Sequence, residues 1–331
     1  MVVFSPCKTL WEYYGFCSKE QKKAFTFLLK QTGLDVKNSV IKGRITPSDV
    51  WKIMTLVQKT QRQWVRRTHG KERWDVVKKY DNTEYTQSML PHLRVLGVVD
   101  PYLSHPRTSD AICVLGATGS SMNKRLKFLE YCIEKGLFRR QNILLLSGER
   151  PLQSGVDGPE YDDFIKKKGE YVVQNGLERD LFQFLYDSSP SAWRHWPVTM
   201  IHGKKGLLPR ATTETTIKTL LNWLKSHPAI KTIAFVSSQP HVLYQKAIIH
   251  SVIQSCNSPI NIRFVGGGAK GIGVDDALAA LGSYIWAITP SILSRISLPK
   301  LSLIEQQELQ AFFKEFYSKQ QSLYGILPKI L

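Results

Sequence analysis

Five short apolar runs, separated by helical patterns, occupy the middle of the chain and constrain its fold more than any other feature. They are Ala111–Leu115, Asn142–Leu146, Val198–Ile201, Thr232–Val236 and Asn261–Val265. Apolar runs of strand length that alternate with amphipathic helices are typical of a mostly parallel β-sheet with helices on both faces. The sequence therefore predicts an α/β domain over this part of the chain.

The first of these runs passes directly into a turn and a helix, within Ala111–Gly136. Gly116 and Gly119 allow the backbone to turn tightly, and the N–H groups that begin the helix can hold an anion. The glycine spacing matches neither the dinucleotide-binding fingerprint nor the phosphate loop that ends in Gly-Lys-Ser/Thr. A ligand site and an ordinary turn capped by Ser120 or Ser121 therefore both fit this segment.

All five apolar runs end in glycine or in polar residues. Because the carboxyl ends of parallel strands lie along one edge of a sheet, we expect these short loops to converge on a pocket. The predicted ligand- and phosphate-binding residues are Gly116, Thr118, Gly119, Ser120, Arg125, Ser147, Gly148, Arg150, Arg210, Thr212, Ser237 and Gly267.

Positive and acidic side chains near these loops suggest a charged ligand. A guanidinium such as Arg125 or Arg150 can hold two phosphate oxygens at once, although a solvated basic side chain is the alternative for each. The acidic residues Asp157, Glu160, Asp162 and Asp163 could recruit Mg²⁺ to a nucleotide phosphate, and a solvated loop is the other interpretation.

Glu214 and His241 are the candidate catalytic residues. Glu214 follows Thr212 at a helix start, where its carboxylate could act as a general base or could simply complete a capping box or complement the helix dipole. His241 begins the helix after the fourth apolar run, where a neutral imidazole could exchange a proton or could cap the turn. We expect both to act in catalysis. No set of residues has the spacing of a metal site.

The chain is strongly basic, with 45 Lys and Arg against 27 Asp and Glu among its 331 residues, a formal net charge of +18. This charge favours an acidic ligand or an acidic protein partner over nucleic acid, because the basic residues are spread along the chain and do not form an arm. The five cysteines show no disulfide or metal pattern, so we expect a reducing, cytoplasmic compartment; secretion as an effector is the alternative. We expect no membrane span, and the apolar segment Ala277–Ser294 is predicted to be a buried helix that ends before Pro290.

Three regions are expected along the chain: a helical N-terminal region at 1–108, an α/β ligand-binding domain at 109–295, and a helical C-terminal extension at 296–331. In the first region, Ser18 and Gln21 form a capping box before one helix, and Thr46-Pro47-Ser48-Asp49 opens a second. Arginines and tryptophans between Arg62 and Trp74 could form a surface for an acidic partner or a solvated helix face.

The order and spacing of the loops resemble the DUF218 family of YdcF/SanA/ElyC-like proteins, over roughly residues 110–268. The resemblance lies in Leu115-Gly116 with Arg125, Ser147-Gly148-Glu149, Thr212-Thr213-Glu214-Thr215 and Ser237-Ser238-Gln239-Pro240-His241. The chain departs from the family pattern at Glu149, where the family has glycine, at Thr215, where it has asparagine, and at Tyr244, where it has arginine. The resemblance implies a Rossmann-like fold and a ligand similar to a nucleotide, S-adenosylmethionine or a phosphorylated lipid precursor.

Two functions remain open from the sequence. The first is an enzyme that transfers or hydrolyses phosphoryl or nucleotidyl groups of an ATP-like or other phosphate-bearing ligand, with Mg²⁺ as a candidate cofactor. The second is a protein that holds its ligand, S-adenosylmethionine included, without turnover, while the N-terminal helices recognise another protein.

Overall fold

The structure is a computed structural model, and it describes residues 7–35, 40–42, 47–66, 76–104, 108–170, 176–189, 193, 195–207 and 210–293, with the single positions 302, 307 and 311. The chain divides into two compact units. Unit 1 combines Met1–Val99 with Lys270–Leu331, and unit 2 is Asp100–Ala269. Unit 2 is therefore an insertion between the two parts of unit 1.

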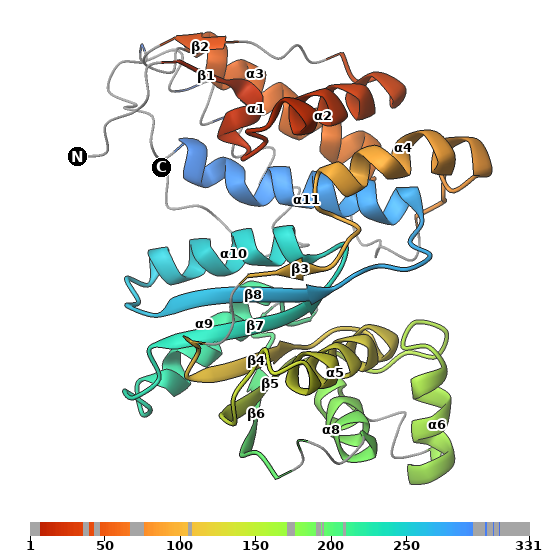
Figure 1. Cartoon of the computed structure of the whole chain (residues 1–331), viewed down its shortest axis with the longest axis vertical. Coiled ribbons are helices and arrows are strands. Elements are labelled where there is room, and N and C mark those ends of the chain that lie inside the picture. The colour runs from red at the N-terminus through yellow and green to blue at the C-terminus, as the bar shows by residue number, and fades with distance from the viewer. Residues whose placement is uncertain are drawn as a thin grey trace. The chain divides into compact units, whose positions relative to one another are not determined.

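Unit 2 is built on a six-stranded sheet in the order β3-β8-β7-β4-β5-β6 (Figure 1). The strands β4 to β8 are parallel to their neighbours, and only β3, at one edge, pairs antiparallel with β8. The predicted mostly parallel α/β sheet is thus confirmed. The strands are β3 (Tyr102–Leu103), β4 (Ala111–Leu115), β5 (Asn142–Gly148), β6 (Val198–Gly203), β7 (Thr232–Ser238) and β8 (Asn261–Gly267).

The five predicted strands begin where the sequence indicates, but four of them run two residues further. Pairing continues into the polar ends, where Ser147 lies opposite His202 and Ser238 lies opposite Gly267. Backbone hydrogen bonds do not require apolar side chains, so the ladder extends past the apolar run. Residues expected in loops are therefore held at fixed positions by the sheet. The segment 100–110 contains two prolines, from which we expect a linker by sequence, and it contributes the edge strand β3.

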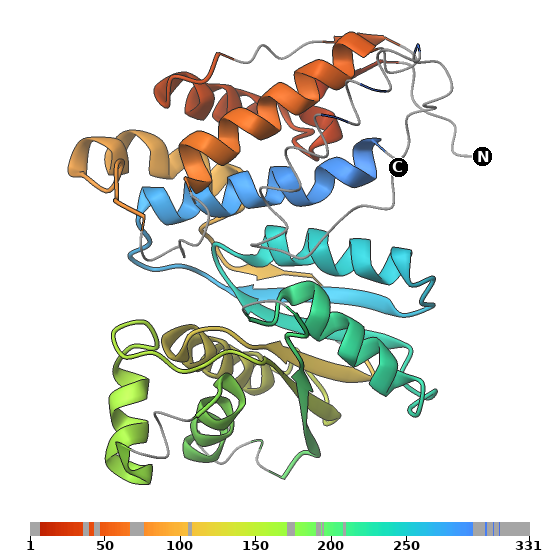
Figure 2. The same cartoon turned by 180° about the vertical axis from the view of Figure 1, so that it is seen from behind.

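Helices cover both faces of this sheet, as predicted (Figure 2). On one face, Val114, Leu145 and Leu126 belong to a single apolar cluster with residues of α8. On the other face, Thr216 of α9 and Val242 of α10 pack over glycines of β6 and β8. The helices of unit 2 are α5 (Gly119–Glu134), α6 (Pro159–Lys168), α8 (Glu178–Ser188), α9 (Thr213–Leu224) and α10 (Val242–Ser255).

One predicted helix of unit 2 was misplaced and one was missed. From the sequence we expect a helix through Phe164–Asn175, after the second apolar run. The structure instead has α6, which begins at Pro159 and ends at Lys168, because Pro159 suits the first turn and Gly169 has φ +88°. Residues 171–175 lie outside the described residues. Helix α8 was not predicted, although Leu181, Phe182 and Leu185 repeat at helical spacing and are buried.

Unit 1 is mainly helical. The predicted capping box is present at the start of α2, where Ser18 and Gln21 exchange side-chain to backbone hydrogen bonds. Helix α4 was not predicted. The elements are β1 (Cys7–Thr9), α1 (Leu10–Tyr13), α2 (Lys19–Gln31), β2 (Val40–Lys42), α3 (Pro47–Thr60), the π-helical turn η1 (Gln61–Val65), α4 (Thr83–Val95) and α11 (Val274–Leu293), and β1 pairs antiparallel with β2.

The last described helix, α11, belongs to unit 1 and not, as expected, to the α/β domain. Asp275, at its start, accepts hydrogen bonds from the backbone N–H groups of Lys79 and Tyr80 and pairs with Arg66. Gln61 donates to the carbonyl of Gly282 over 2.9 Å. These contacts hold α11 against the N-terminal part of unit 1. The sequence did not predict them, because the partners are far apart in the chain.

Helix α11 is buried and apolar, as predicted, but it continues through position 290 to Leu293. A proline removes one hydrogen bond of a helix, and a helix held along its length by other contacts can continue past it. Among the described residues, no helix is long and apolar enough to cross a membrane. The extension expected at 296–331 and the segment from Arg67 to Trp74 lie almost wholly outside the described residues.

Candidate functional site

The carboxyl ends of the parallel strands form the edge where the predicted site residues gather. Counted along the chain from β4, the five parallel strands have the spatial order 5-4-1-2-3, so the order reverses between β4 and β7. In open α/β sheets, ligands bind at this reversal point, outside the carboxyl ends of the strands. The loops after β4 and β7 therefore mark the centre of the candidate site.

Arg125, on α5, joins these two strand ends. Its Nη1 donates to the carbonyl oxygens of Leu115 and Gly116 over 2.7 Å each, and its Nε donates to Oγ of Ser238 over 3.3 Å. The side chain is only 1% exposed. Burial lowers the pKa of Arg125 to about 10, an effect that the charge of Glu178 opposes, so the guanidinium stays charged at neutral pH. The contacts of Arg125 are with the chain itself, and they hold β4 and β7 in register at the reversal point.

Arg150, after β5, is the centre of a buried ionic network. It pairs with Asp157 over 2.6 Å and with Glu178 over 3.0 Å, and it donates to the carbonyl of Ala117. Burial acts to lower the pKa of Arg150, but the hydrogen bond to Asp157 and the charges of Glu178 and Asp157 raise it overall. Both arginines predicted to bind phosphate are thus enclosed and engaged with groups of the protein.

Glu178, the first residue of α8, reaches the ends of β4 and β5. Its Oε1 accepts a hydrogen bond from the backbone N–H of Gly148 over 2.9 Å. A Cβ on Gly116 would stand 2.1 Å from the same oxygen, so this position admits only glycine. Burial raises the pKa of Glu178, against the opposing effects of Arg150, Gly148 and Arg125. The need for glycine at 116 arises from close packing within the protein.

The start of α5, predicted as an anion site, is occupied by a carboxylate of the chain. Oδ1 of the fully buried Asp157 accepts a hydrogen bond from the backbone N–H of Gly119 over 3.0 Å. Glu160 accepts from the Ser120 hydroxyl over 2.6 Å and from the Asn123 amide over 2.8 Å. Two of the four acidic residues considered for Mg²⁺, Asp157 and Glu160, therefore contact α5, whereas Asp162 and Asp163 are exposed on α6. Among the described residues no group of three His, Cys, Asp or Glu could hold a metal ion.

The ends of β5 and β6 bring together Ser147 and His202. These residues lie opposite each other in the parallel ladder, and Oγ of Ser147 lies 3.1 Å from Nδ1 of His202. Burial, and then the charge of Arg179, lower the pKa of His202. The pair was not predicted, because a sequence does not give the register of two strands separated by about fifty residues; Ser147 was predicted only singly, as a ligand-binding residue.

Helix α9 begins over the same two strand ends. Thr212 is its N-cap, and the capping box is completed by Thr215, so Glu214 is free of the capping role considered for it. Oε1 of Glu214 pairs with Lys218 over 2.5 Å. Its other oxygen, Oε2, is buried without a hydrogen-bond partner among the described residues. Most buried polar atoms in native proteins have at least one hydrogen-bond partner, so this carboxylate oxygen is an exception.

The end of β7 leads into α10 through Ser237, Gln239, a cis Gln239–Pro240 bond and His241. Ser237 donates to the side-chain carbonyl of Gln245, and the backbone N–H of Gln239 donates to the carbonyl of Gly267 over 2.9 Å. His241 is half-buried at the first turn of α10, and α10 packs against α9.

The predicted residues thus separate into two groups. Arg125, Ser147, Gly148, Arg150 and Ser237 are buried and hydrogen-bonded, or closely packed, within the protein. The half-buried residues, which solvent can reach at this edge, are Gly116, Thr118, Ser120, Arg210, Thr212, Glu214, His241 and Gly267; Gly119 is buried at the start of α5.

Comparisons of the chain with profiles of known protein families, with curated proteins and with solved structures found no match. The resemblance to the DUF218 family therefore stays a prediction, and the argument for function rests on the geometry of unit 2.

Proposed function

We propose that unit 2 is an enzyme that binds a phosphate-bearing ligand, similar to a nucleotide, over the carboxyl ends of β4 to β7. The observation that supports this most is the reversal of strand order between β4 and β7, with polar loops on both sides of it. A Rossmann-like sheet with this order offers one crevice at this place. Fold alone does not define function, so the assignment depends on the side chains at that edge.

The buried arginines do not supply the phosphate contacts in this proposal. Arg125 and Arg150 instead fix the loops around the site, because Arg125 donates to two carbonyls of the protein and Arg150 pairs with two of its carboxylates. The contacts to phosphate come from the half-buried Arg210 and from Lys204 and Lys205, which follow β6. Their positive potential favours an anionic ligand over a neutral one.

Glu214 is the general base of the proposed reaction. The contact of Oε1 with Lys218 orients the carboxylate, and Oε2, which has no hydrogen-bond partner among the described residues, is the oxygen that takes a proton from a hydroxyl group or a water molecule. His241, on the neighbouring helix, is the second acid–base group. Together they fit phosphoryl or nucleotidyl transfer, or hydrolysis, in which a hydroxyl or a water loses a proton as it attacks phosphorus.

A thermal-shift experiment tests the binding step. The full chain is heated with ATP, ADP, AMP, S-adenosylmethionine or inorganic pyrophosphate, each with and without Mg²⁺. A ligand that binds only the folded protein stabilises it by about 2.7 kcal/mol at one hundred times its dissociation constant, which raises the unfolding temperature by several degrees.

Two variants locate the site. Arg210→Gln, at the carboxyl edge, is expected to remove most of the shift. Arg139→Gln is the matched control, because Arg139 is exposed just before β5, at the opposite edge of the same sheet. The proposal is wrong if no phosphate-bearing compound shifts the unfolding temperature, or if both variants reduce the shift equally.

A further inference from the structure

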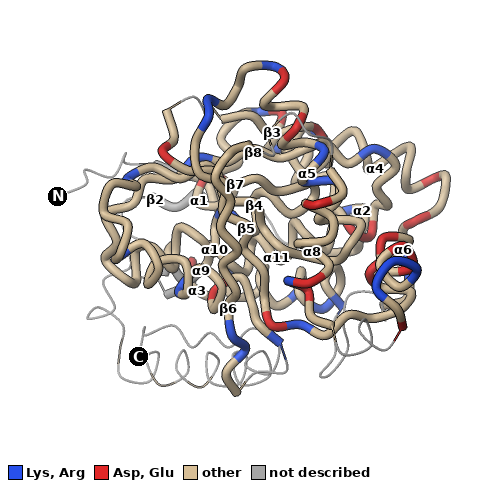
Figure 3. Tube along the Cα trace, turned by 90° about the horizontal axis from the view of Figure 1, so that it is seen from below, with Lys and Arg blue, Asp and Glu red and all other residues tan. Residues whose placement is uncertain are grey.

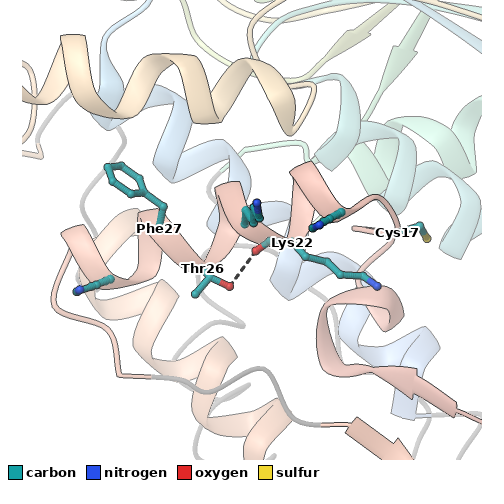
Figure 4. A pocket seen from close by; sticks show the side chains of 7 residues that line it. Cys17, Lys22, Thr26 and Phe27 are labelled. Carbon is teal, nitrogen blue, oxygen red and sulfur yellow. Dashed lines mark hydrogen bonds between the residues drawn. The ribbon is translucent and has the colours of Figure 1, made fainter.

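A basic hollow of about 740 Å³ lies along α2 in unit 1 (Figure 4). Six of its lining residues share one face of α2, at the first helical position and then three, four, seven, eight and eleven positions later, and the seventh precedes the helix. They are Cys17, Lys19, Lys22, Lys23, Thr26, Phe27 and Lys30. All four lysines of α2 are in this set, whereas the only acidic residue of the helix, Glu20, is not.

The four lysines differ in how far the protein neutralises them. Lys22 pairs with Glu12 over 2.7 Å, and its hydrogen bond lowers the pKa of that carboxyl. Lys19, Lys23 and Lys30 are exposed, and among the described residues none of them takes part in an ion pair. Three positive charges on one helix face therefore remain for an external anion.

The hollow also has an apolar component. Thr26 and Phe27 line it and lie between Lys23 and Lys30 in the sequence of α2, and the aliphatic stems of the lysine side chains extend the apolar surface. Thr26 is held in place, since its hydroxyl donates to the carbonyl of Lys22 and accepts from Nε1 of Trp11. The ring of Phe27 stacks on that of His92 with a centroid separation of 4.0 Å.

We propose that this hollow docks an acidic peptide segment of a partner protein, with carboxylates on Lys19, Lys23 and Lys30 and one apolar side chain between them. Opposite charge favours the carboxylates, and the apolar component favours a side chain over a bare phosphate. Nucleic acid fits less well, because one face of Phe27 is covered by His92, whereas the bases of single strands bind by stacking on open aromatic rings.

The test measures binding of a fluorescein-labelled peptide, in which Asp and Glu flank one central leucine, to the full chain by fluorescence anisotropy. The triple variant K19E/K23E/K30E is expected to weaken binding about tenfold or more, and the effect is expected to shrink with added salt. Lys22 is kept, because it supports the local structure through Glu12.

The matched control reverses three other exposed lysines and changes the net charge by the same amount. Lys166, Lys167 and Lys168 occupy the last turn of α6 in unit 2 (Figure 3). K166E/K167E/K168E is expected to bind the peptide as the unmodified chain does. Equal weakening in both variants, or no saturable binding by the unmodified chain, overturns the proposal.

A second readout uses the exposed thiol of Cys17, at the end of the hollow. In the variant C7S/C256S, Cys17 is labelled with an environment-sensitive dye. The two remaining cysteines react slowly with the dye, because burial raises the pKa of the Cys113 thiol and raises the pKa of the Cys132 thiol to about 12. The acidic peptide is expected to change the emission of the dye, and a peptide with serine for the central leucine to change it less. A single-stranded oligonucleotide that competes as effectively as the peptide would overturn the assignment of the partner as a protein.

Discussion

Asp157 accepts a hydrogen bond from the backbone N–H of Gly119, so a carboxylate of the chain itself occupies the start of α5. The first helix after the first strand of a Rossmann-like unit is where a ligand phosphate usually binds. Here the same carboxylate is also held by Arg150. The ligand of this protein is therefore expected to bind without a phosphate at that position.

The ion pair of Asp157 with Arg150 is predicted to be essential for the stability of unit 2. Asp157→Asn leaves the buried guanidinium with Glu178 as its remaining charge partner, and breaking one pair of such a buried network costs up to about 3–5 kcal/mol. Denaturant unfolding followed by tryptophan fluorescence measures the loss. Asp162→Asn, at an exposed position on α6, is the control and is expected to change stability by less than about 0.5 kcal/mol. An equal loss of stability in the two variants would contradict the ion pair between Asp157 and Arg150.

Arg125 is predicted to act as a structural link between β4 and β7. Arg125→Met leaves the carbonyls of Leu115 and Gly116 without their donor, and an unsatisfied buried group costs about 1–3 kcal/mol. Urea unfolding is the measurement, with the exposed Arg139→Met as control. If Arg125 served the ligand alone, the variant would keep its stability and lose only binding.

Acid is predicted to weaken the fold through His202. Because its pKa is lower in the folded chain, the unfolded chain binds more protons below the unfolded pKa of about 6.5. The stabilising contribution is present above that pH and is lost as the pH falls through 6.5 towards the folded pKa. Unfolding midpoints measured across this window are expected to fall, and His202→Gln is expected to flatten the curve. His92 and His250 shift in the same direction, so part of the slope should remain.

Glu214 is predicted to be required for turnover and not for binding. With the nucleotide that gives the largest thermal shift as substrate, Glu214→Gln is expected to lower kcat by about 10²–10⁴ and to leave the dissociation constant nearly unchanged. Glu134→Gln, an exposed position on α5, is the control. Turnover that persists in Glu214→Gln would remove this residue from the mechanism while leaving the binding site itself intact.

The sequence predicted the sheet well, because strand β4 is buried on both faces and such strands read as continuous apolar runs. It predicted the candidate arginines but not their partners. Asp157 and Glu178 lie seven and 28 residues from Arg150, and nothing in a linear pattern distinguishes a buried ion pair from a free cation. For the same reason, the sequence did not predict the strand register that places Ser147 opposite His202.

The boundary of the α/β domain was misjudged for a related reason. Helix α11 follows β8 in the chain and its apolar pattern suits either unit, so only tertiary contacts with η1 and α3 assign it. Deletion of residues 1–108, the N-terminal region expected from the sequence, would therefore remove the helices that α11 packs against. Expression of residues 100–269 alone separates unit 2 from unit 1 without dividing unit 1.

The insertion of unit 2 between the two parts of unit 1 also bears on synthesis of the chain. Domains generally fold as they leave the ribosome, the N-terminal one first. Here Arg66 and Gln61 are made early, but their partners Asp275 and Gly282 emerge only after all of unit 2. Unit 2 can thus complete its sheet on the nascent chain before α11 has been made, when the N-terminal helices still lack the contacts that α11 provides. This order of folding is the reverse of the usual N-to-C order.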